Sequence, residues 1–233
     1  MPLAHSIRAA LAQNSRISQQ SDKTFPLRLL STEQTEIVLE DEASIRVRYQ
    51  EQADLRRRLA DIGVLDQSPE LPLPDRELEK WQQRVMSIYL SDTAVKLNNF
   101  EDLLRKVSFL REVVNSRFLY KTMQVEGERG LYFQTDHGLE LPPGQLSSGE
   151  QHELVLLYRL LFDVPIGAIV LLDEPEISLH IAWQHKVLDD LRAISEISDQ
   201  QYIVATHSPA VVGEWTERMV LLSSSDERQA SNV

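Results

Sequence analysis

The chain has 233 residues, of which 42% are hydrophobic and 26% charged, and its formal net charge is −12. This length and composition fit a globular protein with one sizeable core and an appendage, and they exclude a fibrous or largely disordered chain. No apolar run approaches the roughly 20 residues of a membrane span, and the N-terminus lacks the apolar core of a secretory signal. The sequence has no cysteine, which excludes disulfides and thiolate metal sites. We expect a cytoplasmic protein with no membrane attachment.

The negative charge is concentrated in the C-terminal part. From Leu146 onward the chain has 14 acidic and five basic residues, a charge of −9, and residues 1–145 carry the remaining −3. Neither part is a basic patch, so composition argues against binding of a nucleic-acid backbone as the main activity.

Residues 1–119 are predicted to be a helical region, although the first 30 residues show no clear pattern. Ser31 or Thr32 suits the N-cap of a long, polar helix over residues 32–62. Three prolines between residues 63 and 75 indicate a turn or linker. Apolar residues spaced by three and four then predict a second long helix over residues 75–118. We expect an antiparallel helical hairpin, with two ordinary amphipathic helices of a compact domain as the alternative.

Residues 120–222 are predicted to be a second domain that begins with a short β section. Met123 and Val125 on one side, and Leu131 and Phe133 on the other, flank Gly127-Glu128-Arg129-Gly130. This alternation around two glycines predicts two strands joined by a tight turn.

An alternation of helices and apolar strands follows the β section. The patterns predict helices over residues 148–162, 181–197 and 209–215, and strands over residues 168–172, 202–205 and 219–222. This order is typical of a parallel sheet covered by helices. The aliphatic run at residues 168–172 indicates a strand buried on both faces. Residues 223–233 form a polar tail that we expect to be disordered.

Two adjacent carboxylates, Asp173 and Glu174, end the first of these strands. The carboxyl end of a buried parallel strand faces the crevice where ligands bind in open α/β sheets. Asp173 there is suited to hold Mg²⁺, which prefers oxygen ligands, and Glu174 to orient and polarise an attacking water. The alternative is an acidic pair that merely ends a surface strand.

The segment Leu146-Ser147-Ser148-Gly149-Glu150-Gln151 lies directly before a predicted helix. Free N–H groups and hydroxyls at a positive helix end make an anion site, and glycine permits close approach of the backbone. The alternative is an ordinary helix cap, in which Ser148 is the N-cap and Gln151 completes a capping box. The two interpretations are compatible, because both use the same donors.

His207 follows the strand at residues 202–205, and so it also emerges at a strand end. A histidine there can hydrogen-bond a γ-phosphate or the attacking water, although a single histidine is more often structural. Trp183 and Trp215 are interpreted as core or interface residues.

The order and spacing of these segments carry more weight than any one of them. Gly149 precedes Asp173 by 24 residues, and Asp173 precedes His207 by 34. The chain resembles the ABC-type ATPase superfamily, and most of all the bacterial AAA-family ATPases with an ABC-type head. These are the AAA-15/21 group, related to the overcoming-lysogeny-defect and RecF-like proteins. The resemblance is strong from about Ser116 to Leu222 and rests on the segments LSSGEQ, VLLDEPE, DEPEISLHIAWQ and IVATHSP.

The resemblance implies a role for each segment. It makes residues 146–151 the ABC signature that contacts ATP in trans, Asp173 the Mg²⁺ ligand, and Glu174 and His207 the catalytic residues. Ile177-Ser178-Leu179-His180 is similar to the D-loop, so Ser178 and His180 join the nucleotide-binding residues. The implied fold is a partial P-loop NTPase (ABC-type) of the α/β class, whose parallel sheet has flanking helices and follows a helical, hairpin-like insertion and a small β section.

One part of such an ATPase does not occur in these 233 residues. None of the eight glycines precedes a lysine, so there is no G-x-x-x-x-G-K-[ST] phosphate loop. Related proteins carry that loop in an N-terminal lobe and act as head-to-tail pairs, as the resemblance implies. We therefore expect the C-terminal half of an ATP- and Mg²⁺-dependent ATPase that needs such a lobe or a partner chain and pairs with a second head, for example as a homodimer.

Two other functions stay open from the sequence. The chain is alternatively a non-catalytic dimerisation module, or a nucleic-acid-handling subunit that uses its helical part. The resemblance leaves phage defence, repair and a toxin-linked switch as equally suitable processes. A parallel sheet without its N-terminal strands exposes an edge and a face, so we expect the isolated chain to be marginally stable, self-associating or partner-dependent.

Overall fold

The computed structural model describes residues 2–30, 40–69, 71–127 and 129–222. The chain divides into two compact units, Met1–Leu146 and Ser147–Val233, which are described one at a time. The division lies after the β section, whereas the sequence placed it before, at residue 120. The predicted caps Ser31 and Thr32 and the predicted tail at residues 223–233 lie outside the described residues.

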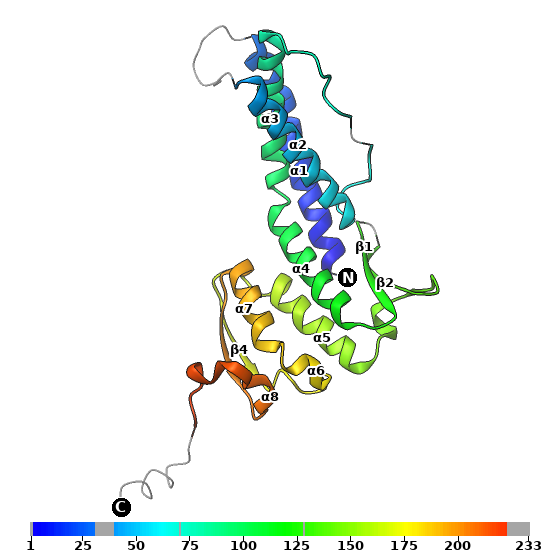
Figure 1. The fold of residues 1–233 in the computed structure, drawn as a ribbon, viewed down its shortest axis with the longest axis vertical. Helices are drawn as coiled ribbons and strands as arrows, with labels where there is room; N and C mark the ends of the chain where they lie inside the picture. Colours follow the sequence, from blue (N-terminus) through cyan, green and yellow to red (C-terminus); the bar gives the residue numbers. More distant parts are fainter. Residues whose placement is uncertain (1, 31–39, 70, 128, 223–233) are drawn as a thin grey trace, which may run out of the picture. The chain divides into compact units, whose positions relative to one another are not determined.

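The first unit combines long helices with an antiparallel sheet (Figure 1). Its described elements are α1 (Pro2–Leu30), α2 (Glu42–Asp61), α3 (Lys80–Asn98), α4 (Glu101–Arg117), β1 (Lys121–Glu126), β2 (Gly130–Thr135), β3 (Glu140–Leu141) and a short 3₁₀ turn, η1 (Pro143–Gln145). No element was predicted for residues 2–30, which form the 29-residue helix α1 with Pro26 inside it.

Helix α2 begins later than predicted. Glu40 and Asp41 are not helical, and the Asp41 carboxylate accepts a hydrogen bond from the Ser44 N–H at 2.7 Å. This hydrogen bond holds the pKa of Asp41 below its ordinary value. A helix that is continuous from residue 32 is therefore wrong, because Asp41 caps a new helix that starts at Glu42.

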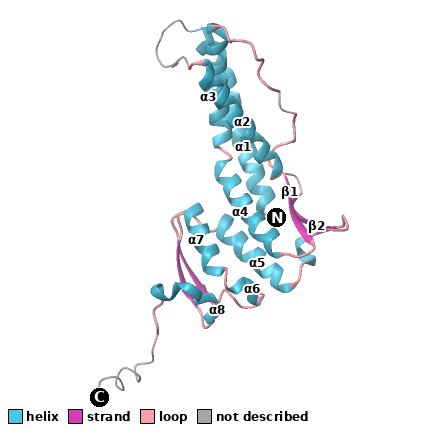
Figure 2. Ribbon diagram, in the orientation of Figure 1, coloured by secondary structure: helices cyan, strands magenta, loops and turns pink. Residues whose placement is uncertain are grey.

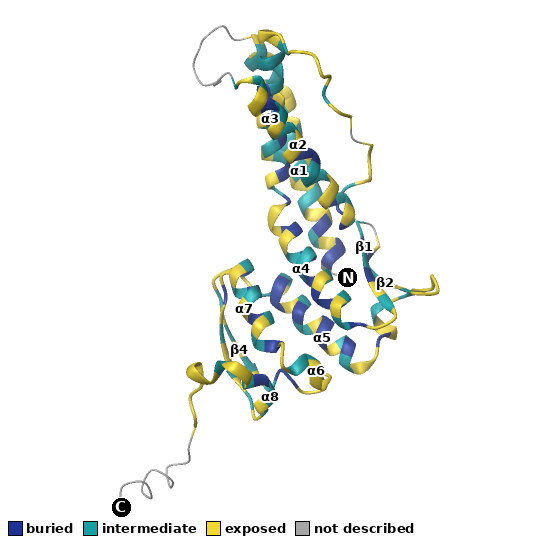
Figure 3. Ribbon diagram, in the orientation of Figure 1, coloured by how far each residue is buried: buried dark blue, intermediate teal, exposed yellow. Residues whose placement is uncertain are grey.

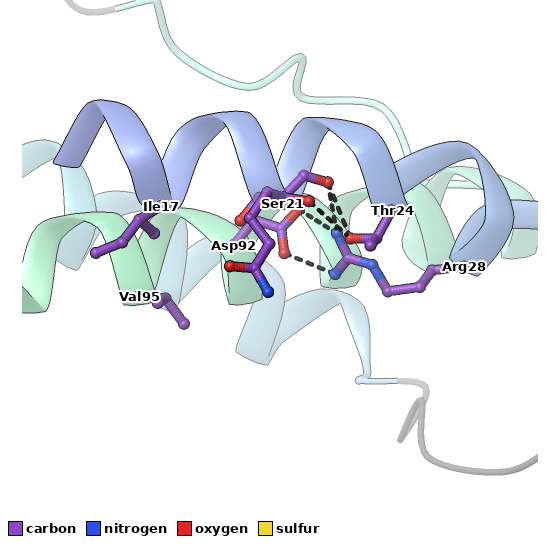
Figure 4. A pocket seen from close by; sticks show the side chains of 7 residues that line it. Ile17, Ser21, Thr24, Arg28, Asp92 and Val95 are labelled. Atoms are coloured by element: carbon purple, nitrogen blue, oxygen red, sulfur yellow. Dashed lines mark hydrogen bonds and ion pairs between the residues drawn. The ribbon is translucent and has the colours of Figure 1, made fainter. Parts of the chain in front are cut away.

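Helix α3 runs antiparallel to α1. The Arg28 guanidinium near the end of α1 makes two hydrogen bonds, of 2.6 and 2.7 Å, to the Asp92 carboxylate in α3 (Figure 4). At the other end of the pair, the Asn99 amide donates to the Ala10 carbonyl at 3.0 Å. Residue numbers thus rise along one helix as they fall along the other.

Helix α3 runs parallel to α2, so the predicted antiparallel hairpin of these two helices is wrong. The Leu78 N–H donates to the Glu42 carboxylate at 3.0 Å, and the Gln52 amide donates to the Leu90 carbonyl at 2.7 Å. Residue numbers rise together along both elements, which excludes an antiparallel pair. The antiparallel neighbour of α3 is α1.

The reason is the proline-rich connection, residues 63–79, which we call the return segment. Its described residues contain no helix, and it runs back beside α2. The Tyr49 hydroxyl donates to the Leu71 carbonyl at 2.6 Å, and the Arg46 guanidinium donates to the Pro74 carbonyl at 2.9 Å. A connection that returns along the helix lets the next helix start at the same end as the previous one.

The predicted helix over residues 75–118 is two helices. Glu79 caps α3 in a capping box with Gln82, so the helix starts at Lys80 and not at Asp75. Asn99 and Phe100 then interrupt it: the Asn99 amide bonds to α1, and the Phe100 side chain is buried. Tertiary contacts of these two residues replace the helical backbone geometry that the apolar spacing predicted.

The predicted two strands and tight turn are confirmed as β1 and β2. They pair antiparallel from Lys121 with Thr135 to Glu126 with Gly130. Met123 and Phe133 are completely buried, as the alternation predicted. Strand β3 adds to the β2 edge, which gives the order β1-β2-β3.

The second unit is a mixed α/β arrangement with a two-stranded parallel sheet (Figure 2). Its described elements are α5 (Ser148–Tyr158), the π-helical turn η2 (Arg159–Asp163), β4 (Ile169–Asp173), α6 (Ile181–Gln184), α7 (Val187–Ser198), β5 (Gln201–Ala205), α8 (Pro209–Val212) and the 3₁₀ segment η3 (Gly213–Arg218). The predicted strands at residues 168–172 and 202–205 are confirmed, as is their parallel pairing. The predicted helix over residues 181–197 is interrupted at His185 and Lys186.

Two predictions for this unit are wrong. Residues 219–222 form no strand; their side chains are exposed, and their backbone has no ladder partner among the described residues. Strand β4 is not buried on both faces, because Ile169 and Leu171 are 63% and 74% exposed. Ile203 of β5 is 61% exposed on the same sheet. We call Ile169, Leu171 and Ile203 the open face; Figure 3 shows no buried position along β4, whereas α7 has several.

Candidate functional site

The carboxyl ends of β4 and β5 bring two of the predicted residues together. The last pair in the sheet is Asp173 with Ala205, and the Glu174 N–H continues it by donating to the Ala205 carbonyl at 2.8 Å. His207 follows two residues later, and its Nε2 lies 3.7 Å from Glu174 Oε1. The imidazole is 94% exposed and the carboxylate 37%, so both are open to a ligand from outside.

The backbone after β4 makes an unusually tight turn. Glu174 has a φ of 45° and Ser178 a φ of 70°, both in the left-handed region that non-glycine residues seldom occupy. Within this turn, the Ile177 N–H donates to the Glu174 carbonyl at 3.1 Å, and the Leu179 N–H donates to the Glu176 carbonyl at 3.0 Å. Such geometry is concentrated at functional sites in proteins.

Asp173 is exposed at the end of β4. Among the described residues there is no cluster of three or more acidic or histidine side chains that could hold a metal ion. Mg²⁺ commonly binds through one or two carboxylates, several waters and the phosphates of a nucleotide. The donor set therefore fits a Mg²⁺ ion that arrives with a nucleotide, and it does not fit a stand-alone metal site.

The start of α5 is a capping box, one residue earlier than predicted. The Ser147 side chain accepts a hydrogen bond from the Glu150 N–H, and the Glu150 carboxylate accepts from the Ser147 N–H at 3.0 Å. The predicted cap of Ser148 with Gln151 is wrong, because Ser148 is already the first helical residue. Ser147 and Ser148 are exposed, Gln151 is half-buried, and Leu146 and Glu150 are buried.

Gly149 has a close neighbour from another predicted segment. A Cβ placed on Gly149 would lie 2.9 Å from the Ser178 carbonyl oxygen, so only glycine permits this approach. The first turn of α5 and the tight turn after β4 are thus in direct contact. The structure brings the LSSGEQ and ISLH segments together through these two residues.

His180 has a structural partner in the described geometry. Its Nδ1 accepts a hydrogen bond from the Ala182 N–H at 3.3 Å and caps α6, and its ring lies 5.8 Å from the Trp183 ring. The structure does not bring His180 to the pair of Glu174 and His207 by any hydrogen bond between described residues.

Sequence reasoning missed two residues of this region, Glu176 and Thr206. The Thr206 hydroxyl donates to the Glu176 carboxylate, which is 7% exposed. Glu176 was visible only as the third acid of the DEPE segment, and Thr206 as the residue before His207. An acidic residue two positions after Glu174 was the available signal.

Comparison with protein families shows the family of this chain. The family described as "AAA domain, putative AbiEii toxin, Type IV TA system" matches residues 6–213. The chain belongs to this AAA-domain family. The match includes the helical region as well as every motif described above.

Curated relatives of this AAA-domain protein are similar over shorter stretches. The chain is 28% identical over 80 residues to the oligopeptide transport ATP-binding protein OppD of Mycobacterium bovis, covering 34% of this chain and 13% of OppD. It is 32% identical over 98 residues to the molybdenum import ATP-binding protein ModC of Pseudomonas aeruginosa, covering 42% of this chain and 26% of ModC. The chain thus spans a small part of either relative. Family and relatives together support an ATPase-like function in general.

Two further observations bear on the AAA-domain chain. No helix in the described part combines the length and apolar character that crossing a bilayer requires. A cavity of about 380 Å³ lies between α1 and α3, where Figure 4 shows Arg28 extending toward Asp92 and Ser21. None of the predicted site residues lines this cavity.

Proposed function

We propose that this chain supplies the catalytic groups for ATP hydrolysis in an ABC-type composite site. The observation that carries the proposal is the 3.7 Å approach of His207 to Glu174 at the ends of two parallel strands. In the proposed reaction, a water forms the new bond to the γ-phosphorus, and the bond to the β,γ-bridging oxygen breaks to give ADP and inorganic phosphate. Glu174 orients and polarises the water, and His207 hydrogen-bonds the γ-phosphate or that water.

Asp173 is the proposed Mg²⁺ residue. A bound Mg²⁺ would supply positive charge to the β- and γ-phosphate oxygens. Residues 146–151, Ser178 and His180 are proposed to contact ATP that a second head holds. Ser147 and Ser148 are exposed at the start of α5, which supports this role, because the positive N-terminus of a helix suits an anion.

The phosphate loop has to come from outside these 233 residues. We propose an N-terminal lobe as its source, on the same polypeptide or on a partner chain. The open face supports this proposal, because an exposed aliphatic sheet face favours a cover that removes it from water. Pairing with a second head, as a homodimer or head-to-tail, is the other proposed contact.

The test is ATP turnover with the lobe that carries the phosphate loop supplied to the chain. Glu174→Gln keeps the size of the side chain and removes its charge, and we expect phosphate release to fall by about 100-fold or more. Glu196→Gln, an exposed acid of α7, is the matched control and should leave the rate unchanged. Turnover that survives Glu174→Gln, or that never appears with the lobe present, contradicts the proposal.

The open face also favours a second candidate, an interaction module without catalysis. Leu171→Thr with Ile203→Thr makes this face more polar while placing β-branched residues, which suit strands, at both positions. If the chain is such a module, this double variant loses self-association or partner binding, and the unmodified chain binds no nucleotide even with the lobe present. Nucleotide binding by the chain together with the phosphate-loop lobe would favour the ATPase over the interaction module.

A further inference from the structure

We infer that Glu176 and Thr206 are a positioning pair that fixes the loop carrying His207 to the turn after β4. The inference rests on the proposed function, in which His207 acts at the γ-phosphate. Neither residue is assigned a role by the motifs described above. The pair acts through the backbone of His207 and does not touch the reacting groups.

Within the described ranges, no hydrogen bond to the imidazole of His207 is seen. Its closest ion-pair contact is the 3.7 Å approach to Glu174, which is longer than a hydrogen bond, and the side chain is 94% exposed. The direction in which His207 points therefore depends on the conformation of residues 205–208. The contacts that fix the backbone of residues 205–208 therefore determine the position of the imidazole.

Thr206 holds this backbone on both sides of the histidine. Its hydroxyl donates to Glu176 Oε1, and its Oγ1 accepts a hydrogen bond from the Ser208 N–H at 3.0 Å. One hydroxyl thus uses its donor and an acceptor position at the same time. His207 lies between Thr206, which carries this hydroxyl, and Ser208, whose N–H donates to it.

Glu176 connects the same hydroxyl to the turn after β4. Its carboxylate is 7% exposed, and its backbone carbonyl accepts from the Leu179 N–H at 3.0 Å. A buried carboxylate is stabilised by a hydrogen-bond donor, because burying an unpaired polar group away from water costs free energy. Oε2 of this carboxylate has no hydrogen-bond partner within the described ranges, so Thr206 is the donor seen for this side chain.

Two longer contacts close the connection into a ring. The Ser208 hydroxyl lies 3.4 Å from Gln184 Oε1, and the Gln184 amide donates to the Leu179 carbonyl at 3.3 Å. The ring runs through residues 176, 179, 184, 206 and 208, and it joins the loop after β5 to the turn that contacts Gly149. Because these two contacts are long, the bond between Thr206 and Glu176 is the strongest side-chain link in the ring.

The test follows the His207 ring directly by NMR in the full 233-residue chain, with its signal assigned from His207→Gln. Thr206→Val removes the hydroxyl and keeps the shape, and we expect the His207 signal to shift or broaden while the other five histidines keep theirs. Thr206→Ser retains the hydroxyl and should restore the signal. Glu176→Gln alters the same bond from the other side and serves as the second variant if Thr206→Val does not fold.

The matched control is Leu191→Ala, which removes a buried α7 side chain. It should lower the melting temperature at least as much as Thr206→Val and leave the His207 signal in place. An unchanged His207 signal in both Thr206→Val and Glu176→Gln overturns the inference, as does an equal shift in Leu191→Ala.

A second arm separates this inference from the proposed function. With the phosphate-loop lobe supplied, Thr206→Val should lower kcat by about tenfold with KM nearly constant, because the loss lies in orientation and not in uniform binding. If the unmodified chain shows no turnover, the proposed function fails, and the NMR arm still decides whether the pair positions His207.

Discussion

The two sheets of this molecule are built from similar apolar residues and reach very different degrees of burial. In the first unit, Met123 of β1 and Phe133 of β2 are fully inaccessible to water. In the second unit, neither β4 nor β5 has a buried residue, and the open face is more than 60% exposed at each of its three positions. Antiparallel β1 and β2 alternate between a buried and a wetter side, whereas β4 alternates only between half-buried and exposed positions.

The difference shows what each sheet needs. A sheet with alternating residues is stable with one covered face, and the helices of its own unit cover it. A parallel strand with aliphatic residues on both sides is suited to cover on both faces, and the described chain covers one. The apolar face of the first sheet is therefore covered within its own unit, whereas the second sheet leaves its open face exposed to water.

The largest effect should come from deleting matched apolar side chains in the two sheets. Phe133→Ala removes a fully buried ring that stacks on Phe118 at 5.8 Å, and we expect the free energy of unfolding to fall by about 3–5 kcal/mol. Ile203→Ala in β5 should change it by less than about 0.5 kcal/mol, because the side chain is 61% exposed. Urea unfolding of both variants measures the contrast, and equal losses would show that β5 is covered.

A second test compares two glycines of the first unit. Gly63 has a φ of 69°, and an added Cβ would lie 1.9 Å from the Val125 carbonyl oxygen of β1. Gly63→Ala should destabilise the protein by about 2 kcal/mol or more, through both strain and the clash. Gly144→Ala is the control, since a Cβ there meets nothing within 4 Å. Thermal unfolding of the pair gives the result; similar melting temperatures would contradict the close packing at β1.

Capping of α5 offers a smaller effect in the second unit. Ser147→Ala removes the side chain that accepts from the Glu150 N–H, and we expect a loss of about 1 kcal/mol in unfolding free energy. Ser148→Ala places a good helix former at the first helical position and should be nearly neutral. The reverse order of the two losses would favour the cap at Ser148 that the sequence suggested.

A pH-dependent effect should appear in alkaline solution. Burial raises the pKa of Tyr202 from 10.0 to about 12, and burial together with Asp163 raises that of Tyr158 to about 12. Below pH 10 both phenols are protonated in the folded and unfolded chain, so stability is unaffected. Between pH 10 and 12 the unfolded chain loses these protons first, so the stability of the second unit falls. Urea midpoints at pH 9 and pH 11.5 measure this, and Tyr202→Phe should flatten the dependence; an equal slope would contradict it.

Sequence reasoning succeeded where a short pattern determines the structure. Alternation around two glycines was enough for β1 and β2, and aliphatic runs followed by polar residues were enough for β4 and β5. The approach of His207 to Glu174 could be expected because parallel strands end at the same edge of a sheet. The role of His180 as a cap, and the tight approach of Gly149 to Ser178, could not, since both depend on backbone geometry after the strand.

The sequence did not predict the relative direction of the helices or the partners of the apolar segments. Apolar spacing predicts a helix but not which neighbour it faces, so α1 was not placed and α2 was paired with α3 in the wrong sense. The apolar residues at 219–222 look like a strand, but a strand also needs a partner for its backbone hydrogen bonds. The break at Asn99 and Phe100 came from contacts with α1 and the core, which local spacing does not encode.

The return segment also affects how the first unit folds. Gln52 contacts Leu90 across 38 residues, and Arg28 contacts Asp92 across 64. Helical proteins usually fold quickly because their contacts are local in sequence, and rates fall as the separation of contacting residues grows. Each long closure adds an entropic cost before any contact forms. We therefore expect this helical unit to fold at a rate closer to that of a mixed α/β domain than to that of a simple helical bundle.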